Sequence, residues 1–98
     1  MRVHWSRRAL QDLREIGAFI SQDSPSAARR WINRLQESAR KAATMPRAGR
    51  VVPELNLENI REVLPGNYRL VYRLKEREIE ILTVFEGHRL LRLDPFED

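Results

Sequence analysis

The chain of 98 residues has no cysteine, only two histidines, and four glycines that stand singly. Without cysteine there can be no disulfide framework, thiolate metal site or cysteine nucleophile. His4 and His88 cannot hold a metal ion by themselves, and isolated glycines form neither a phosphate-binding loop nor the Gly-x-Ser-x-Gly turn of serine hydrolases. We therefore expect no metal site, no cofactor and no nucleotide-driven chemistry.

Long apolar runs are also missing. None approaches the roughly 18 residues that cross a bilayer, and the segment after Met1 reaches Arg7 and Arg8 without the apolar core of a signal peptide. We expect a cytoplasmic protein that makes no contact with membranes. At roughly 100 to 200 residues per domain, the chain forms one domain over residues 1–98.

Positive charge is concentrated in the first half of the chain. Residues 1–50 carry 11 Lys and Arg against 4 Asp and Glu, whereas residues 51–98 carry 7 against 10. Sixteen of the 18 basic residues are arginine, whose planar guanidinium suits phosphate and carboxylate recognition. The composition favours an acidic partner, either nucleic acid or protein, although a solvated arginine-rich surface explains it equally well.

The first half of the chain predicts a short strand and two helices. Residues 2–5 alternate in polarity as a strand does, and Ser6 can cap a helix that starts near Arg7. Ser24 followed by Pro25 predicts the start of a second helix, which ends by Thr44. Both helices have one apolar stripe, and the short link between them indicates an antiparallel helical hairpin.

The second half of the chain predicts a sheet. Residues 45–59 show no clear period and are interpreted as a loop or short irregular segment. Ile60–Leu64, Tyr68–Leu74 and Glu78–Phe85 are rich in β-branched and aromatic residues and predict a three-stranded antiparallel meander. The expected fold is α+β, with an N-terminal short strand and the helical hairpin packed on a three- to four-stranded antiparallel sheet.

Several arginines fall on the predicted sheet or at its end. Arg69 and Arg73 share one face of the middle strand, Arg61 can approach them from the strand before, and Arg89 follows the last strand. Like charges held close on a sheet are destabilising unless anions compensate them. A bound partner could supply these anions, and so could Glu62, Glu78 or Glu80 within the sheet.

The ordered set of elements and short motifs resembles the RelE/ParE toxin superfamily of bacterial type II toxin–antitoxin systems. The resemblance covers nearly the whole chain. It rests on the strand, the helical hairpin, and then Ile60-Arg61-Glu62, Asn67-Tyr68-Arg69, Tyr72-Arg73, and Ile79 to Val84 followed by Gly87-x-Arg89. The resemblance implies a small cytoplasmic toxin, blocked by a cognate antitoxin with which it forms a hetero-oligomer.

The superfamily has two main branches, and the resemblance favours the ParE-like branch, whose members poison DNA gyrase without recognised catalytic residues. RelE-like members instead cleave mRNA on the ribosome with basic residues and often a late tyrosine or histidine. This chain has no tyrosine after Tyr72 and reads Glu86-Gly87-His88 where members often read His-Gly. As an endoribonuclease it would have to use Glu86, His88 and Arg89. A non-toxic RNA-binding or scaffold domain is a third possibility.

Candidate contacts follow from these readings. We expect Arg61, Arg69, Arg73 and Arg89 to contact the target, on the basis of charge. The antitoxin is expected to be acidic and partly disordered, and to fold onto the helical hairpin. Trp31 and Leu35 are the expected antitoxin-binding residues, although Trp31 also fits a core position.

Overall fold

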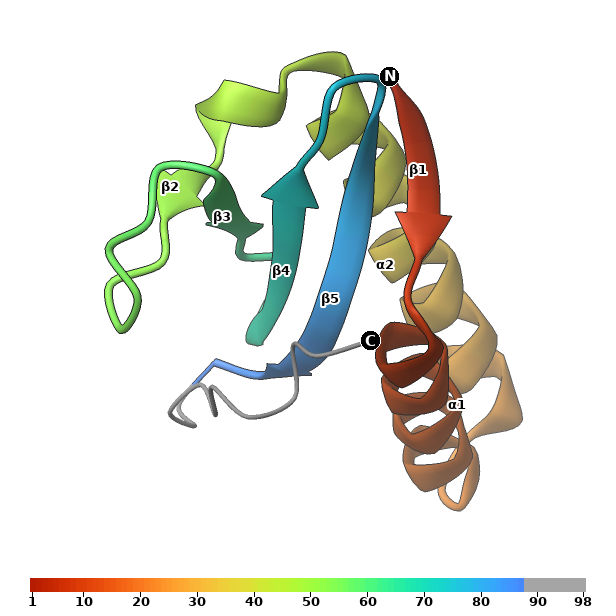
Figure 1. The fold of residues 1–98 in the computed structure, drawn as a ribbon. Coiled ribbons are helices and arrows are strands. Elements are labelled where there is room, and N and C mark those ends of the chain that lie inside the picture. The colour runs from red at the N-terminus through yellow and green to blue at the C-terminus, as the bar shows by residue number, and fades with distance from the viewer. Residues whose placement is uncertain (88–98) are drawn as a thin grey trace.

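The computed structural model describes residues 1–87 (Figure 1). His88 and Arg89, which the sequence marked as candidate site residues, lie outside this range. The elements are β1 (Arg2–Trp5), α1 (Arg7–Ser21), α2 (Pro25–Thr44), a 3-10 turn η1 (Pro46–Ala48), β2 (Arg50–Val51), β3 (Ile60–Val63), β4 (Tyr68–Leu74) and β5 (Glu78–Glu86).

The strands form one sheet in the order β1-β5-β4-β3-β2. The three predicted strands β3, β4 and β5 form the antiparallel meander, and β1 joins β5 in parallel. The α+β fold is therefore confirmed, with five strands rather than three or four. The additional strand β2 is only two residues long and lies in the segment that was interpreted as irregular; it pairs antiparallel with β3.

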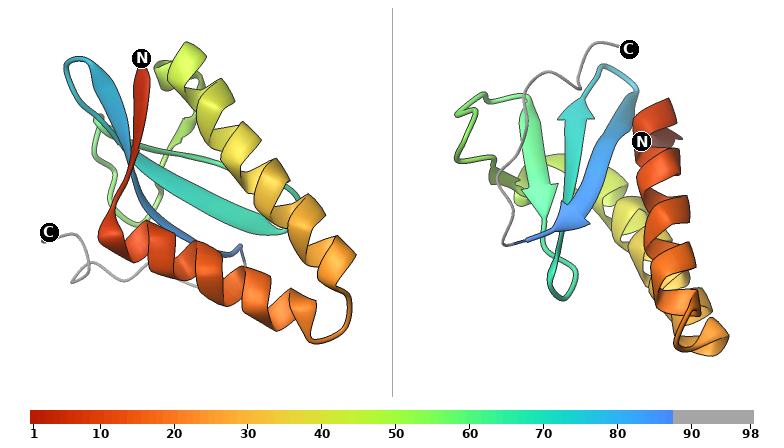
Figure 2. Two further views of the ribbon diagram at one scale, coloured as in Figure 1. Left: turned by 90° about the vertical axis from the view of Figure 1, so that its right-hand side faces the viewer. Right: turned by 90° about the horizontal axis from the view of Figure 1, so that it is seen from below.

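Both helices begin where their capping residues predict. The Ser6 side chain accepts a hydrogen bond from the Ala9 N–H, and the Ser24 side chain accepts one from the Ala27 N–H. These bonds satisfy backbone donors that have no partner inside the first turn. The helices meet at the short turn after α1 and diverge from it in front of the sheet (Figure 2). The predicted helical hairpin is confirmed, in a splayed form.

Both faces of the sheet carry a buried apolar cluster. The cluster under the helices includes Leu13, Leu35, Tyr72 and Ile81. The opposite face has a smaller cluster made of Val52, Ile60, Val71 and Leu82, with Leu55 and Phe85 packed against it. The segment after β2 contributes Val52 and Leu55, so it covers part of the sheet instead of extending into solvent.

The linker from α2 to β2 is fixed against the sheet by Tyr72. Its hydroxyl donates a hydrogen bond of 2.5 Å to the Pro46 carbonyl, and burial raises the pKa of the Tyr72 hydroxyl. Gly49 lies so close to this hydroxyl and to the Glu62 carbonyl that a Cβ atom there would overlap with both. Glycine is therefore required at this position for space.

Helix α1 covers the part of β5 that β1 does not reach. Strand β1 pairs with residues 78–81 only, and the Ser6 hydroxyl then donates to the Leu82 carbonyl. One oxygen of Asp12 accepts hydrogen bonds from the Thr83 hydroxyl and the Val84 N–H. Burial raises the pKa of the Asp12 carboxyl, and these hydrogen bonds oppose the rise. The backbone groups of β5 beyond the end of β1 are thus hydrogen-bonded by Asp12 of α1 and by its capping residue Ser6.

Candidate functional site

Arg69 lies at the centre of a buried ion cluster on the sheet face away from the helices. Its Nε donates to Glu62 at 2.7 Å, and its two terminal nitrogens donate to the two oxygens of Glu54 at 2.6 and 2.7 Å. Arg50 donates to the second oxygen of Glu62 at 2.6 Å. The Arg69 side chain is 6% exposed and the Glu62 side chain is fully buried. The hydrogen bonds to Glu54 are the main reason that the pKa of Arg69 is raised, so this guanidinium remains charged.

The other two sheet arginines also have partners inside the chain. Arg61 is 11% exposed and donates to the Glu58 carboxylate at 2.9 Å and to the carbonyl oxygens of Arg47 and Gly49. Arg73 donates to Glu80 at 3.3 Å and is 27% exposed. Of the three, Arg73 has the most surface left for an external contact.

Of the two sources of anions that the sequence left open, a bound partner or carboxylates of the chain, the structure shows the second for the sheet arginines. Neutralisation within the sheet holds for Arg69 through Glu62 and for Arg73 through Glu80. Two further carboxylates, Glu54 and Glu58, come from the segment between β2 and β3, which was interpreted as irregular. A role for the arginines in target binding stays a prediction.

Only one member of the hypothetical endoribonuclease set lies in the described range. Glu86 ends β5 opposite Tyr68. Burial, with a smaller contribution from the Glu86 charge, raises the pKa of the Tyr68 hydroxyl. His4 is the one histidine among residues 1–87, and it lies beside Glu80, six residues from Glu86 along β5, or roughly 20 Å.

The two predicted antitoxin contacts lie inside the chain's own packing. Leu35 has no exposed surface and is a core residue, so the structure leaves it no surface for a direct contact, and its binding to the antitoxin stays a prediction. Trp31 is half-buried, with its ring edge-to-face against Tyr68 at 5.2 Å between centroids and the Arg34 guanidinium 4.9 Å from the ring centre. Its contact with an antitoxin stays a prediction.

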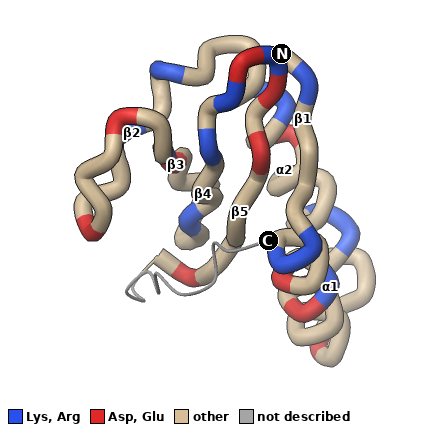
Figure 3. Tube along the Cα trace, in the orientation of Figure 1, with Lys and Arg blue, Asp and Glu red and all other residues tan. Residues whose placement is uncertain are grey.

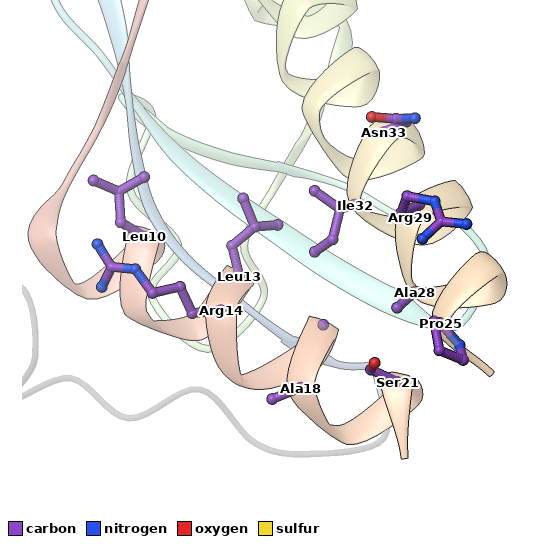
Figure 4. A pocket seen from close by; sticks show the side chains of 11 residues that line it. Leu10, Leu13, Arg14, Ala18, Ser21, Pro25, Ala28, Arg29, Ile32 and Asn33 are labelled. Carbon is purple, nitrogen blue, oxygen red and sulfur yellow. The ribbon is translucent and has the colours of Figure 1, made fainter. Parts of the chain in front are cut away.

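A hollow between the helices was not predicted. A groove of about 590 Å³ opens between α1 and α2, and neither Trp31 nor Leu35 lines it. Leu13 and Ile32 point toward one another across it (Figure 4). The residues that line it are Leu10, Leu13, Arg14, Gly17, Ala18 and Ser21 of α1 and Pro25, Ala28, Arg29, Ile32 and Asn33 of α2.

The groove combines an apolar floor with basic edges. Leu10, whose spacing from Leu13 places it on the apolar side of α1, is 38% exposed because the helices diverge beside it. Arg14 and Arg29, both exposed, flank the groove from opposite helices. Arg14 donates a hydrogen bond to Gln11, and neither arginine has an ion pair with a carboxylate of residues 1–87. Basic residues are frequent along both helices and are mixed with acidic ones on α1, whereas on the sheet the basic residues of β4 lie beside the acidic residues of β5 (Figure 3).

Other kinds of site find no support in the described part of the chain. Among residues 1–87, no three His, Asp or Glu side chains come together as metal ligands. No helix in that range is both long and apolar enough to cross a membrane. The described residues form a groove with an apolar floor and basic edges on the helices, and a largely neutralised sheet face.

Comparisons with known proteins agree on one family. The model for the ParE toxin of the type II toxin–antitoxin system parDE matches residues 3–91. The protein Y4kP of Sinorhizobium fredii is 38% identical over 90 residues, covering 90% of each chain. Toxin RelE2 of Caulobacter vibrioides is 34% identical over 88 residues, covering 90% of this chain and 97% of that one. The fold matches a chain of the chromosomal ParDE system of P. aeruginosa with a TM-score of 0.72 at 21% identity, covering 88% of this chain and 95% of the other.

Proposed function

Because the chain belongs to the ParE toxin family of type II toxin–antitoxin systems, we propose that it stops growth by binding and poisoning DNA gyrase, and that its antitoxin docks between α1 and α2. The antitoxin partner follows from the family. The gyrase target and the docking groove are proposals that rest on the geometry of the sheet arginines and of the helices.

The internal ion pairs of the sheet arginines are the observation that favours a protein target over RNA. An endoribonuclease needs free cations for the phosphate and a positioned acid and base. Here the guanidinium of Arg69 has its donors committed to Glu54 and Glu62, and Arg61 is bound to Glu58 and backbone carbonyls. These contacts support action by protein binding rather than by RNA cleavage.

Of the three described sheet arginines, Arg73 is best suited to contact gyrase. It is partly exposed and has one hydrogen bond to Glu80, which a partner carboxylate can replace or share. Arg89 remains the second proposed contact, from outside the described residues. Arg61 and Arg69 act in this proposal by holding the segment between β2 and β3 against the sheet.

An in vitro supercoiling assay tests the target. Purified, folded toxin at micromolar concentration should inhibit DNA supercoiling by gyrase, and Arg73→Gln should weaken the inhibition. Arg77→Gln, which removes an exposed arginine from the β4–β5 turn, is the matched control and should inhibit as the wild type does. Absence of inhibition, together with codon-spaced cuts in translated mRNA by primer extension, would replace gyrase with the ribosome and mRNA as the target.

The groove suits an amphipathic acidic segment of the antitoxin. An apolar stripe of such a segment can enter between Leu13 and Ile32, while carboxylates on its two sides meet Arg14 and Arg29. Exposed charge pairs of this kind contribute up to about 1 kcal/mol each and weaken as salt increases. Specificity for the antitoxin would then come from the groove and its basic edges together.

Charge reversal at the edges of the groove tests this docking mode. Arg14→Glu combined with Arg29→Glu should weaken antitoxin binding by about tenfold or more at low salt, measured by isothermal titration calorimetry. Arg77→Glu changes the net charge away from the groove and serves as the control. Equal losses of affinity in both variants would mean that the antitoxin responds to total charge and not to the groove.

A further inference from the structure

Gly17 lies inside α1, where a glycine is unexpected. Glycine is less favourable than alanine in the interior of a helix because it loses more backbone freedom on folding. Gly17 is four residues from the last residue of α1, so it has no capping role. Its backbone also lacks the positive φ angle that Gly66 adopts in the β3–β4 turn. Conformation therefore gives no reason for glycine at this position.

The reason is the space between the helices. A Cβ atom at Gly17 would lie 3.3 Å from Cδ1 and 3.4 Å from Cγ1 of Ile32. Such distances are shorter than most carbon–carbon contacts, so Ile32 would have to move away from α1. Both residues line the groove, and Ile32 projects across it from α2 (Figure 4). The absent Cβ thus allows the Ile32 side chain to lie close against the α1 backbone.

We propose that Gly17 and Ile32 together set the width of the groove and thereby select which apolar side chain of the antitoxin can enter it. This inference rests on the proposed docking of the antitoxin between α1 and α2. Because Ile32 lies close against the α1 backbone at Gly17, room is left beside Ile32 for a large side chain of the antitoxin. A methyl group at position 17 displaces Ile32 into that room.

We expect a methyl group at position 17 to change the affinity for the antitoxin and not the stability of the fold. Of the two atoms that meet the added methyl group, Cδ1 is the free end of the half-buried Ile32 side chain and can turn about χ2, whereas Cγ1 has to shift by a few tenths of an ångström. Alanine in turn favours the helix. In a fitted apolar pocket, one additional methyl or methylene group changes discrimination by about 10- to 200-fold. Gly17→Ala should therefore fold as well as the wild type and bind the antitoxin less tightly.

Calorimetric titration with the purified cognate antitoxin tests the proposal on the full-length toxin. Gly17→Ala should weaken binding by about tenfold or more. The double variant Gly17→Ala with Ile32→Val should regain most of the affinity, because valine lacks the Cδ1 atom nearest to the new methyl group. Phe19→Leu changes an exposed apolar side chain of α1 that does not line the groove, and it should bind as the wild type does.

Two outcomes overturn different parts of the reasoning. If Leu10→Glu, which places a carboxylate in the groove, weakens binding but Gly17→Ala does not, the antitoxin uses the groove and the role given to Gly17 is wrong. If Leu10→Glu also leaves binding unchanged, the docking mode itself is wrong. Thermal unfolding of each variant verifies that it is folded, and Ile32→Val alone should still alter affinity if Gly17→Ala fails to fold.

Discussion

The ion cluster around Arg69 predicts that this arginine stabilises the fold and is not a contact for the target. Arg69→Met removes the cation while keeping an apolar stem of similar length against Phe85, whose ring centre lies 5.1 Å from the guanidinium. The buried Glu62 then keeps only Arg50 as its charged partner, and Glu54 loses both hydrogen bonds from the guanidinium.

The size of the loss follows from burial. Removing one member of a buried ion pair costs about 3 to 5 kcal/mol, because the remaining charge stays buried without compensation. The lower end applies here, since Arg50 still donates to Glu62 and Glu54 is exposed enough to be hydrated. A loss of about 3 kcal/mol is a large part of the roughly 5 to 15 kcal/mol that stabilise a domain. It lowers the melting temperature of a domain of this size by roughly 12 to 24 °C.

Urea unfolding followed by circular dichroism measures the change in the free energy of unfolding. Arg77→Met, an exposed arginine in the β4–β5 turn, should change it by about 0.5 kcal/mol or less. The double variant Arg69→Met with Glu62→Leu should regain part of the loss, because no carboxylate is then left buried beside a missing cation. Gyrase inhibition is compared below the melting temperature of each variant.

One result would refute the reasoning. If Arg69→Met unfolds at the wild-type urea concentration yet no longer inhibits gyrase, then Arg69 contacts the target and its internal ion pairs are incidental. Loss of stability with inhibition retained by the folded fraction is the expected outcome.

Two further predictions concern single positions. Gly49→Ala should lower the free energy of unfolding by about 1 to 3 kcal/mol in a urea titration, because the new Cβ overlaps with the buried Tyr72 hydroxyl; an unchanged midpoint would contradict the packing described. Asp12→Asn keeps an oxygen that can accept from the Thr83 hydroxyl and removes a carboxylate whose pKa burial raises above its usual 3.8. Because a raised pKa makes the protonated carboxyl the better-tolerated form, wild-type Asp12 favours folding below about pH 4 and loses this contribution as the pH rises through the folded-state pKa. At pH 7 the free energy of unfolding of the variant should therefore equal or exceed that of the wild type, and the difference should shrink toward pH 4. If the variant instead loses stability relative to the wild type as the pH rises from 4 to 7, the reasoning is wrong.

Local signals predicted the helices and the meander well. Ser6 and Ser24-Pro25 determine the helix starts through contacts three residues away, so they can be identified without knowledge of the rest of the fold. The alternation along Tyr68–Leu74 likewise separates a helix-facing side from an arginine-bearing side, as observed. Signals of this kind depend on a few neighbouring residues.

The candidate site depended on contacts between distant residues and was harder to predict. Glu54 reaches Arg69 from 15 positions earlier, in a segment where a strand of two residues leaves no period to detect. The groove depends on the angle between the two helices, which leaves Leu10 partly exposed although its spacing matches that of buried neighbours. The glycine at position 17 was the one available sign, since it interrupts a good helical sequence without ending it.

The parallel pairing of β1 with β5 has a consequence for how the toxin folds during its synthesis. Val3 and Ile79 stand side by side in the sheet although most of the polypeptide separates them. Contacts so distant along the chain form slowly, and during translation the partner of β1 emerges only after nearly all other elements. A prematurely terminated product that lacks β5 therefore leaves β1 and α1 without the strand against which they pack.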